Sequence, residues 1–237
     1  MKAHLLSKAS VPIPGFHAGW QPDPPDVIAA NPRFGTIMHA VVHGPDGAPI
    51  YDQPVWAEPL GAVIVPLQPD GSVVFVENHR PVVAAGPWEY PPRTLDGCGC
   101  VSLELPRGFA NPGEEPLATA VREAEEELGM EVGVVERLGL ANPNTTYCIG
   151  GHEIYLARLT GRPSTRHPPD LAESIVRTVT LDVPGLLHAI RSGRIFCGIT
   201  KSALMTFFAS QPAARRGLDE GLALDAPTGE RGNQIPA

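Results

Sequence analysis

The chain has 237 residues, enough to bury one large core with an appendage, and a formal net charge of −8 at pH 7. The negative charge argues against nucleic-acid binding, because neutralising phosphates requires clustered lysine and arginine side chains, and no apolar run approaches the roughly 20 residues of a membrane-spanning helix. The small number of cysteines and an N-terminus without the apolar stretch of a signal peptide argue against a secreted disulfide scaffold, so we expect a cytoplasmic protein.

The first 56 residues carry strand signals outside the main body of the chain. Residues 1–35 are rich in proline, glycine and alanine without a sustained period, which predicts an irregular arm. The run 37–43 is followed by the turn signal GPDG and a second run at 48–56, which predicts a hairpin. Exposed strand edges need pairing, so residues 1–56 are a candidate dimerisation segment and we expect a homodimer.

Residues 57–209 alternate between strand-like and helix-like patterns. The predicted strands cover 62–67, 73–77, 101–105, 132–140, 153–159 and 175–183. The predicted helices cover 116–128, 184–192 and 200–209. Strands on both sides of one strong helix predict an α/β domain with helices on both faces of a sheet. The tail, 210–237, has no periodicity and is predicted to be disordered.

The helix at 116–128 has the clearest signals in the chain. Leu117, Val121, Ala124 and Leu128 recur at helical spacing and predict one apolar stripe. A proline starts this segment and a glycine follows it, as is typical of helix ends.

Three carboxylates share one face of this helix. Glu123, Glu126 and Glu127 stand at i, i+3 and i+4, where like charges repel by a few tenths of a kcal/mol per pair. Such a cluster can be a solvated acidic face. It can also bind a divalent cation, because Mg²⁺ is usually held by a few carboxylates together with substrate phosphates and water.

The flanking residues favour the metal site, because the segment 108–130 resembles the Nudix box, G-x5-E-x7-R-E-U-x-E-E-x-G-U, where U is a bulky aliphatic residue. The matching residues are Gly108, Glu114, Arg122, Glu123, Glu126, Glu127, Gly129 and Met130. Ala124 is smaller than the usual aliphatic residue and leaves the carboxylates untouched. The resemblance implies a Nudix-type α/β/α sandwich with a mixed sheet over 57–209, preceded by a β-strand extension.

The same resemblance implies a function and a set of site residues. It implies hydrolysis of a nucleoside diphosphate linked to another moiety, with Mg²⁺, or Mn²⁺ as a substitute. Glu123 and Glu127 would be the metal ligands together with the backbone carbonyl of Arg107, and Glu126 would join the catalytic network. In related enzymes a loop beyond the box supplies the base, and at that place Glu173 is favoured over Asp170.

Segments beyond the box resemble the ADP-ribose pyrophosphatase-like branch and imply that Arg80 and Arg107 bind substrate. ADP-ribose or another nucleotide sugar is therefore the expected substrate. Tyr147 keeps a dinucleoside polyphosphate open, because a tyrosine in this region is associated with hydrolases of those compounds. A non-catalytic Nudix ligand sensor is a further alternative, and the intact box speaks against it. Trp56, Trp88 and Tyr90 are candidates to stack on the base.

Overall fold

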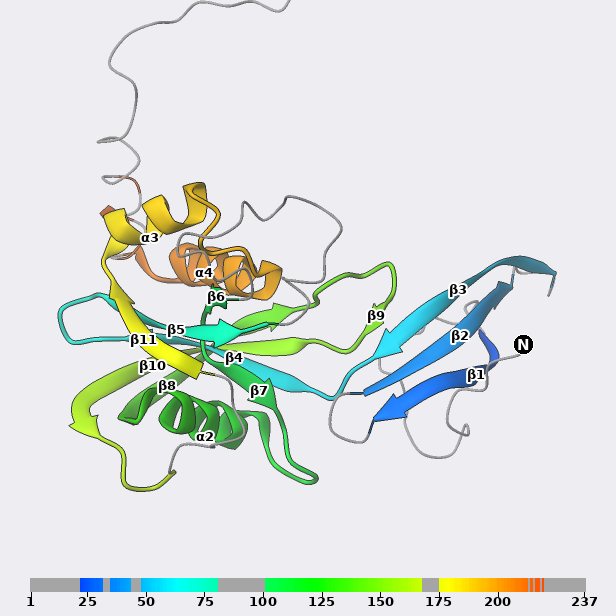
Figure 1. Cartoon of the computed structure of the whole chain (residues 1–237), viewed down its shortest axis with the longest axis horizontal. Helices are drawn as coiled ribbons and strands as arrows, with labels where there is room; N and C mark the ends of the chain where they lie inside the picture. Colours follow the sequence, from blue (N-terminus) through cyan, green and yellow to red (C-terminus); the bar gives the residue numbers. More distant parts are fainter. Residues whose placement is uncertain are drawn as a thin grey trace, which may run out of the picture.

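The computed structural model describes most of the chain between residues 22 and 219. The described residues are 22–31, 35–43, 48–80, 101–167 and 175–212, with 214, 216, 217 and 219. Within them the chain forms two β-sheets and three helices (Figure 1).

The N-terminal sheet and the central sheet are built from different parts of the chain. The N-terminal sheet contains β1 (Pro22–Asn31), β2 (Gly35–His43), β3 (Pro49–Ala57) and β9 (Cys148–Ile149). The central sheet contains β4 (Gly61–Leu67), β5 (Val73–His79), β6 (Val101–Glu104), β7 (Arg107–Phe109), β8 (Met130–Ala141), β10 (His152–Pro163) and β11 (Ile175–Leu181). The helices are α2 (Pro116–Leu128), α3 (Val183–Arg191) and α4 (Gly198–Ser210).

The central sheet is mixed and lies between helices, which confirms the predicted α/β class. Its strand order is β11-β5-β4-β10-β8, with β6 paired to β5 and β7 paired to β4. Strand β10 runs parallel to β4 and antiparallel to β8. Figure 1 shows α2 on one face of this sheet and α3 and α4 on the other.

Both faces of the central strands are buried, because each face is covered by helices. Val63, Val65 and Phe75 belong to the cluster that packs under α3 and α4. Ile64 and Val74 alternate with them and pack on the α2 side. The near-continuous apolar runs of β4 and β5 therefore reflect a two-sided core rather than one solvated face.

Helix α2 packs on the sheet through small side chains. Ala120, Ala124 and Leu128 lie in the core, whereas Leu117 remains half-exposed. The predicted apolar stripe was therefore wrong at its first residue: the contact face is narrower and starts one turn later. Gly129 ends the helix with φ of 65°, a left-handed conformation that suits glycine.

A buried carboxylate at the back of α2 fixes the end of the helix to the next strand. Glu125 is fully buried and accepts hydrogen bonds from Val132 N at 2.9 Å and from Ser164 Oγ at 2.7 Å. Arg166 pairs with the same carboxylate. Burial would raise the pKa of Glu125, but these donors lower it below its usual value, so the group stays charged.

The N-terminal sheet corrects the prediction of an irregular arm over 1–35 for residues 22–31, while residues 1–21 and 32–34 lie outside the described residues. Residues 22–31 form β1, which pairs antiparallel with β2, and register shifts interrupt the pairing after Asp23 and Val27. The sequence prediction missed this strand because three prolines lie at its start, and proline is compatible with an edge strand such as β1. Strand β3 pairs with β9 in parallel, so the loop between β8 and β10 joins this sheet.

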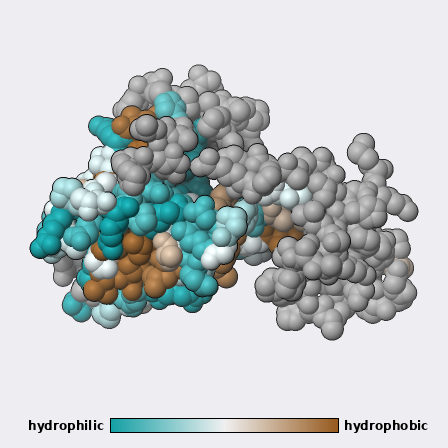
Figure 2. Space-filling model, turned by 90° about the horizontal axis from the view of Figure 1, so that it is seen from below, coloured by the Kyte–Doolittle hydropathy of each residue, from teal (hydrophilic) through white to brown (hydrophobic). Residues whose placement is uncertain are grey.

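Figure 2 shows the α2 side of the molecule, where polar residues surround an apolar patch over α2 and β8. Leu117 and Val134 are exposed large apolar side chains of these two elements. Beyond α4, in the segment predicted as a disordered tail, the described residues as far as Asp219 include helical ones, and Ala214 packs against the core. In the part of the chain that is described, no helix is long and apolar enough to cross a membrane.

Candidate active site

The predicted box forms a strand, a loop and helix α2, with Glu123 packed against the backbone of Gly108. A Cβ atom at position 108 would lie 2.1 Å from the Glu123 carboxylate, far inside contact distance. Only glycine therefore lets the strand and the carboxylate approach so closely. Glu123 is buried, with a relative exposure of 4%.

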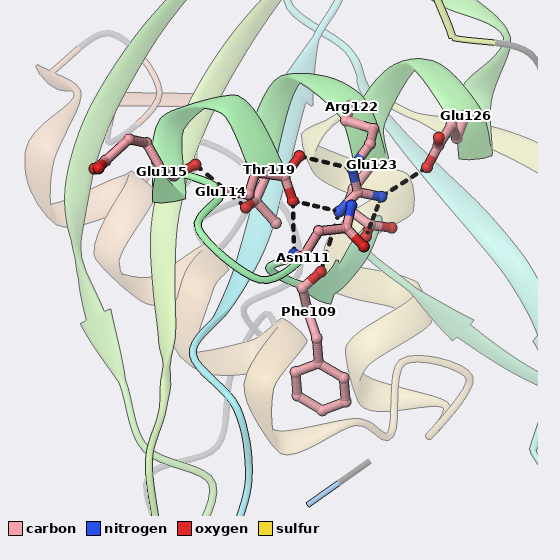
Figure 3. A network of polar contacts seen from close by, with 8 residues as sticks. All are labelled: Phe109, Asn111, Glu114, Glu115, Thr119, Arg122, Glu123 and Glu126. Carbon is pink, nitrogen blue, oxygen red and sulfur yellow. Dashed lines mark hydrogen bonds and ion pairs between the residues drawn. The ribbon is translucent and has the colours of Figure 1, made fainter. Parts of the chain in front are cut away.

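Arg122 organises the acidic groups of the box (Figure 3). Its Nη1 donates to Glu123 Oε1 and to Glu126 Oε2, both at 2.8 Å, and its Nε donates to Glu114 Oε1 at 2.8 Å. The Phe109 carbonyl accepts a further bond from Nη2 at 3.1 Å. The hydrogen bond from Arg122 lowers the pKa of Glu114 to about 2. One guanidinium thus ties the loop to the helix and offsets the repulsion among the carboxylates.

Glu127 lies one helical turn beyond Glu123 and is also buried. It is within electrostatic range of the Arg107 guanidinium. Burial would lower the pKa of Arg107, but the nearby carboxylates of Glu104 and Glu127 raise it above its usual value. The structure therefore brings Arg107 beside the acidic face of α2. The predicted role of its backbone carbonyl as a metal ligand stays a prediction.

Arg80 and Arg107 meet at a carboxylate that the sequence analysis did not single out. Glu104, at the end of β6, accepts bonds from Arg80 Nη2 at 2.8 Å and from Arg107 Nε at 3.2 Å. Burial would raise the pKa of Glu104, but the Arg80 hydrogen bond and the Arg107 charge lower it below its usual value. The available signal was one charged residue inside the apolar strand 101–105 (VSLEL).

Other predicted site residues lie outside the described part of the chain. These are Glu173 with its neighbour Asp170, and the aromatic residues Trp88 and Tyr90. Their predicted roles stay predictions. Trp56 and Tyr147, by contrast, are described and lie together.

A cavity of about 380 Å³ lies where β3 meets the loop before β9. Its lining residues are Ile37, Gln53, Pro54, Val55, Trp56, Thr146 and Tyr147. Trp56 N donates to the Tyr147 carbonyl at 2.6 Å, and Gln53 Nε2 donates to the Thr146 carbonyl at 2.8 Å. These bonds hold two aromatic side chains at one apolar cavity with a few polar groups, a composition typical of small-molecule pockets.

A buried polar group connects this cavity with the box. Glu58, two residues after Trp56, has Oε1 3.7 Å from His152 Nδ1. Burial raises the pKa of Glu58, and the Cys148 thiol and the charge of Arg107 offset part of this rise. The His152 ring lies 5.7 Å from the ring of Phe109, measured between centroids. Burial and the charge of Arg107 lower the pKa of His152 to about 4, so the ring is neutral at pH 7.

The protein side chains near the box supply only some of the oxygen ligands that a hard divalent cation requires. In the described ranges no three histidine, cysteine, aspartate or glutamate side chains are grouped as a complete cage. Glu123 and Glu127 nevertheless offer two buried carboxylates on one helix face, beside the close approach at Gly108. Mg²⁺ is usually bound by one or two carboxylates plus substrate phosphates and water, so this pair fits such an ion.

A comparison with models of known protein families identifies the same domain as the fold and the acidic helix α2 do. The model of the family described as NUDIX domain matches residues 58–193. The chain therefore belongs to the Nudix family and is a Nudix pyrophosphohydrolase. Nudix hydrolases act on small-molecule nucleotide substrates and generally use divalent metal ions.

Two similar proteins add detail. The chain is 30% identical over 179 residues to the CMP-5'-(N-acetyl-N-hydroxy-3-aminopropyl)phosphonate hydrolase of Streptomyces rubellomurinus, covering 75% of this chain and 77% of that protein. The fold of the present chain is similar to the crystal structure of an ADP compounds hydrolase, with a TM-score of 0.62 and 16% identity. The match covers 84% of this chain and 97% of the other chain. At that identity the second likeness concerns the fold alone.

Proposed function

We propose that this enzyme uses Mg²⁺ to cleave the diphosphate bond of a nucleoside diphosphate linked to another moiety. ADP-ribose or another nucleotide sugar is the leading substrate, which would yield a nucleoside monophosphate and a sugar phosphate. The observation that carries the proposal is the placement of the buried Glu123 and Glu127 beside the Arg80–Glu104–Arg107 cluster. Carboxylates for a cation and guanidiniums for phosphate oxygens are the two parts that such a substrate requires.

In this proposal Glu123, Glu127 and the Arg107 carbonyl hold the cation. Bound Mg²⁺, or Mn²⁺ in its place, would neutralise phosphate oxygens and lower the pKa of a bound water. Arg122 keeps Glu123 aimed, because it fixes that carboxylate from one side while Gly108 leaves it room on the other. Glu126, which the same guanidinium holds, would orient the attacking water.

The remaining roles divide between the two ends of the substrate. Arg80 and Arg107 would bind the diphosphate, and the cavity between Trp56 and Tyr147 would take the base, because aromatic faces stack on any nucleobase. Glu173, which the described ranges do not include, stays our prediction for the general base.

A second substrate is favoured by the relative at 30% identity, which acts on a CMP-linked phosphonate. Both substrates place a nucleoside monophosphate next to a second phosphorus group, so the same carboxylates and guanidiniums would serve. They differ in the base and in the leaving group. A purine and a pyrimidine are therefore the useful contrast in an assay.

Our first prediction tests the metal site through Glu127→Gln. This change keeps the size of the side chain and removes a charge that the cation needs, so we expect kcat to fall about 10³-fold, equivalent to roughly 4 kcal/mol of transition-state stabilisation. The measurement is product release from ADP-ribose, a CMP-linked phosphonate and a dinucleoside polyphosphate, with Mg²⁺, with Mn²⁺ and with EDTA.

Glu136→Gln is the matched control, because Glu136 is exposed on β8, away from the box. It should keep wild-type turnover. Wild-type kcat in the Glu127 variant at saturating Mg²⁺, or undiminished turnover in EDTA, would contradict the metal site. Absence of turnover of all three compounds by the wild type would contradict the proposed substrate class.

A further inference from the structure

We propose that Glu104 is a positioning residue that holds Arg80 and Arg107 in a fixed arrangement. Together the two guanidiniums, here called the fork, would bind the phosphorus group of the substrate that is not attached to the nucleoside. The fork would set the affinity for that group, whichever nucleoside is attached. This inference rests on the proposed function, which assigns the two arginines to the substrate.

The geometry of Glu104 is that of a support beneath the two arginines. Its side chain is 4% exposed, whereas those of Arg80 and Arg107 are 33% and 24% exposed. Arg80 contacts both carboxylate oxygens, through Nε at 3.2 Å and through Nη2 at 2.8 Å. Arg107 reaches Oε2 through Nε and Nη2, each at 3.2 Å. The carboxylate is therefore buried, while part of each arginine side chain still reaches the surface.

The charges of this cluster leave it able to bind an anion. One carboxylate faces two guanidiniums, so the group of three keeps a net positive charge. A guanidinium has five N–H donors, and neither arginine directs Nη1 at Glu104 in the described contacts. Such donors suit phosphate oxygens, which guanidiniums bind in bidentate geometry.

The position of the fork indicates which part of the substrate it would meet. Arg107 directly precedes Gly108, whose backbone packs against the Glu123 carboxylate, so the fork borders the acidic face of α2 where the cation would be held. A diphosphate has two adjacent phosphorus groups. If one phosphorus group binds the cation and the nucleoside points toward Trp56, the second phosphorus group is the one that would bind the fork.

The chain offers a matched control on the other face of the same strand pair. Glu77 is equally buried and also holds two arginines, Arg177 and Arg194. In the register of β5 and β6, Glu77 pairs with Leu103, which lies in the core under α3 and α4, while Glu104 pairs with Val76 on the α2 side. Loss of either charge removes a similar structural interaction, but only Glu104 borders the box.

The experiment compares Glu104→Gln with Glu77→Gln. Steady-state kinetics with ADP-ribose and a CMP-linked phosphonate give KM and kcat. Calorimetry with inorganic pyrophosphate in EDTA gives the affinity of the fork in the absence of a cation. Thermal unfolding gives the stability of each variant. For Glu104→Gln we expect KM for both substrates and the pyrophosphate Kd to rise about tenfold or more, with kcat within about threefold of wild type. Glu77→Gln should change these three constants less than about twofold, although both variants lower Tm.

Glu104→Asp supplies the second variant, because it keeps the charge one methylene further from the arginines. It should recover at least part of the affinity lost in the Gln variant, and it serves the same test if Glu104→Gln fails to fold. Equal changes of KM and Kd in the Glu104 and Glu77 variants, or an Asp variant as weak as the Gln variant, would overturn the fork. Pyrophosphate binding that depends on Glu104 in an enzyme that cleaves neither substrate would instead leave the fork standing and remove the proposed function.

Discussion

The close contact between Gly108 and Glu123 explains why the box needs glycine at a position without a positive φ angle. The hypothetical Cβ would overlap the carboxylate itself rather than a neighbouring backbone atom. Any side chain at residue 108 must therefore push Glu123 away, and Glu123 is also anchored to Arg122. The space that the Glu123 carboxylate needs therefore explains why residue 108 is a glycine.

We predict that Gly108→Ala lowers metal affinity while the domain stays folded. The added methyl group would displace the Glu123 carboxylate, so the Mg²⁺ concentration for half-maximal activity should rise about tenfold or more, as for other losses of metal-site geometry. The measurement is a Mg²⁺ titration of activity together with thermal unfolding. Gly113→Ala is the control for an added methyl group, because nothing lies within 4 Å of its hypothetical Cβ, although its φ of 79° will cost some stability. An unchanged Mg²⁺ requirement in Gly108→Ala would show that Glu123 does not hold the ion.

The sequence predicted the acidic face but not the support beneath the arginines. The spacing of Glu123 and Glu127 within one helix is local, so helical periodicity was enough to place both on one face. Glu104 and Arg107 are three residues apart, but Arg80 comes from another segment, and its approach to Glu104 depends on the pairing of β6 with β5. Such non-local pairing cannot be obtained from the period of a single strand. For the same reason the sequence predicts an irregular arm where β1 lies, because its prolines disfavour a strand and its pairing with β2 is not encoded in its own period.

The junction of β3, β9 and β10 joins the two sheets through buried polar groups. Gly61, at the start of β4, leaves room for the His152 ring, since a Cβ there would lie 2.7 Å from His152 Cδ2. Neither ring nitrogen has a hydrogen-bond partner in the described structure. Protonating this ring would place a charge in a dry site beside Arg107, which is why it remains neutral in the folded protein.

We predict that this junction weakens as the pH falls below about 6.5. The pKa of His152 is about 4 in the folded protein against a usual value of 6.5. The unfolded chain therefore binds a proton that the folded chain rejects, and the stability that is complete above pH 6.5 declines toward pH 4, by about 1 kcal/mol at pH 5.5. Urea unfolding of the wild type and of His152→Gln at pH 7 and 5.5 measures this difference.

The Gln variant should lose this part of the pH dependence, whereas His188→Gln, a change at an exposed histidine of α3, should retain it. Identical pH dependence in wild type and His152→Gln would mean that the junction histidine is not responsible.

Exposed apolar side chains lie in at least two separate regions of the described surface. Ile50 and Tyr51 of β3 and Trp56 are exposed on the N-terminal sheet, and Val134 is exposed on β8. We keep the prediction of a homodimer formed through the N-terminal strands. Exposed apolar side chains beside strand edges are the features that a second copy would cover.

We therefore expect a mass of twice 25.2 kDa in light scattering at micromolar concentration. Ile50→Glu should shift the protein toward the monomer, because it places a charge on the proposed interface. Val134→Glu changes an equally exposed residue of the other region and should leave the dimer intact. A monomeric wild type, or a monomer produced only by Val134→Glu, would rule out the N-terminal interface.

The parallel pairing of β4 with β10 sets the order in which a newly made chain can fold. Gly61 pairs with His152, and Asn78 pairs with Ile175, so β4 and β5 each gain one of their partners only from a segment made much later. The hairpin of β2 and β3 needs only neighbouring residues and can form first. A chain that stops after β8 would contain every residue of the box, yet β4 would lack its partner β10 and β5 would lack its partner β11. Such fragments should aggregate or require a chaperone rather than behave as small hydrolases.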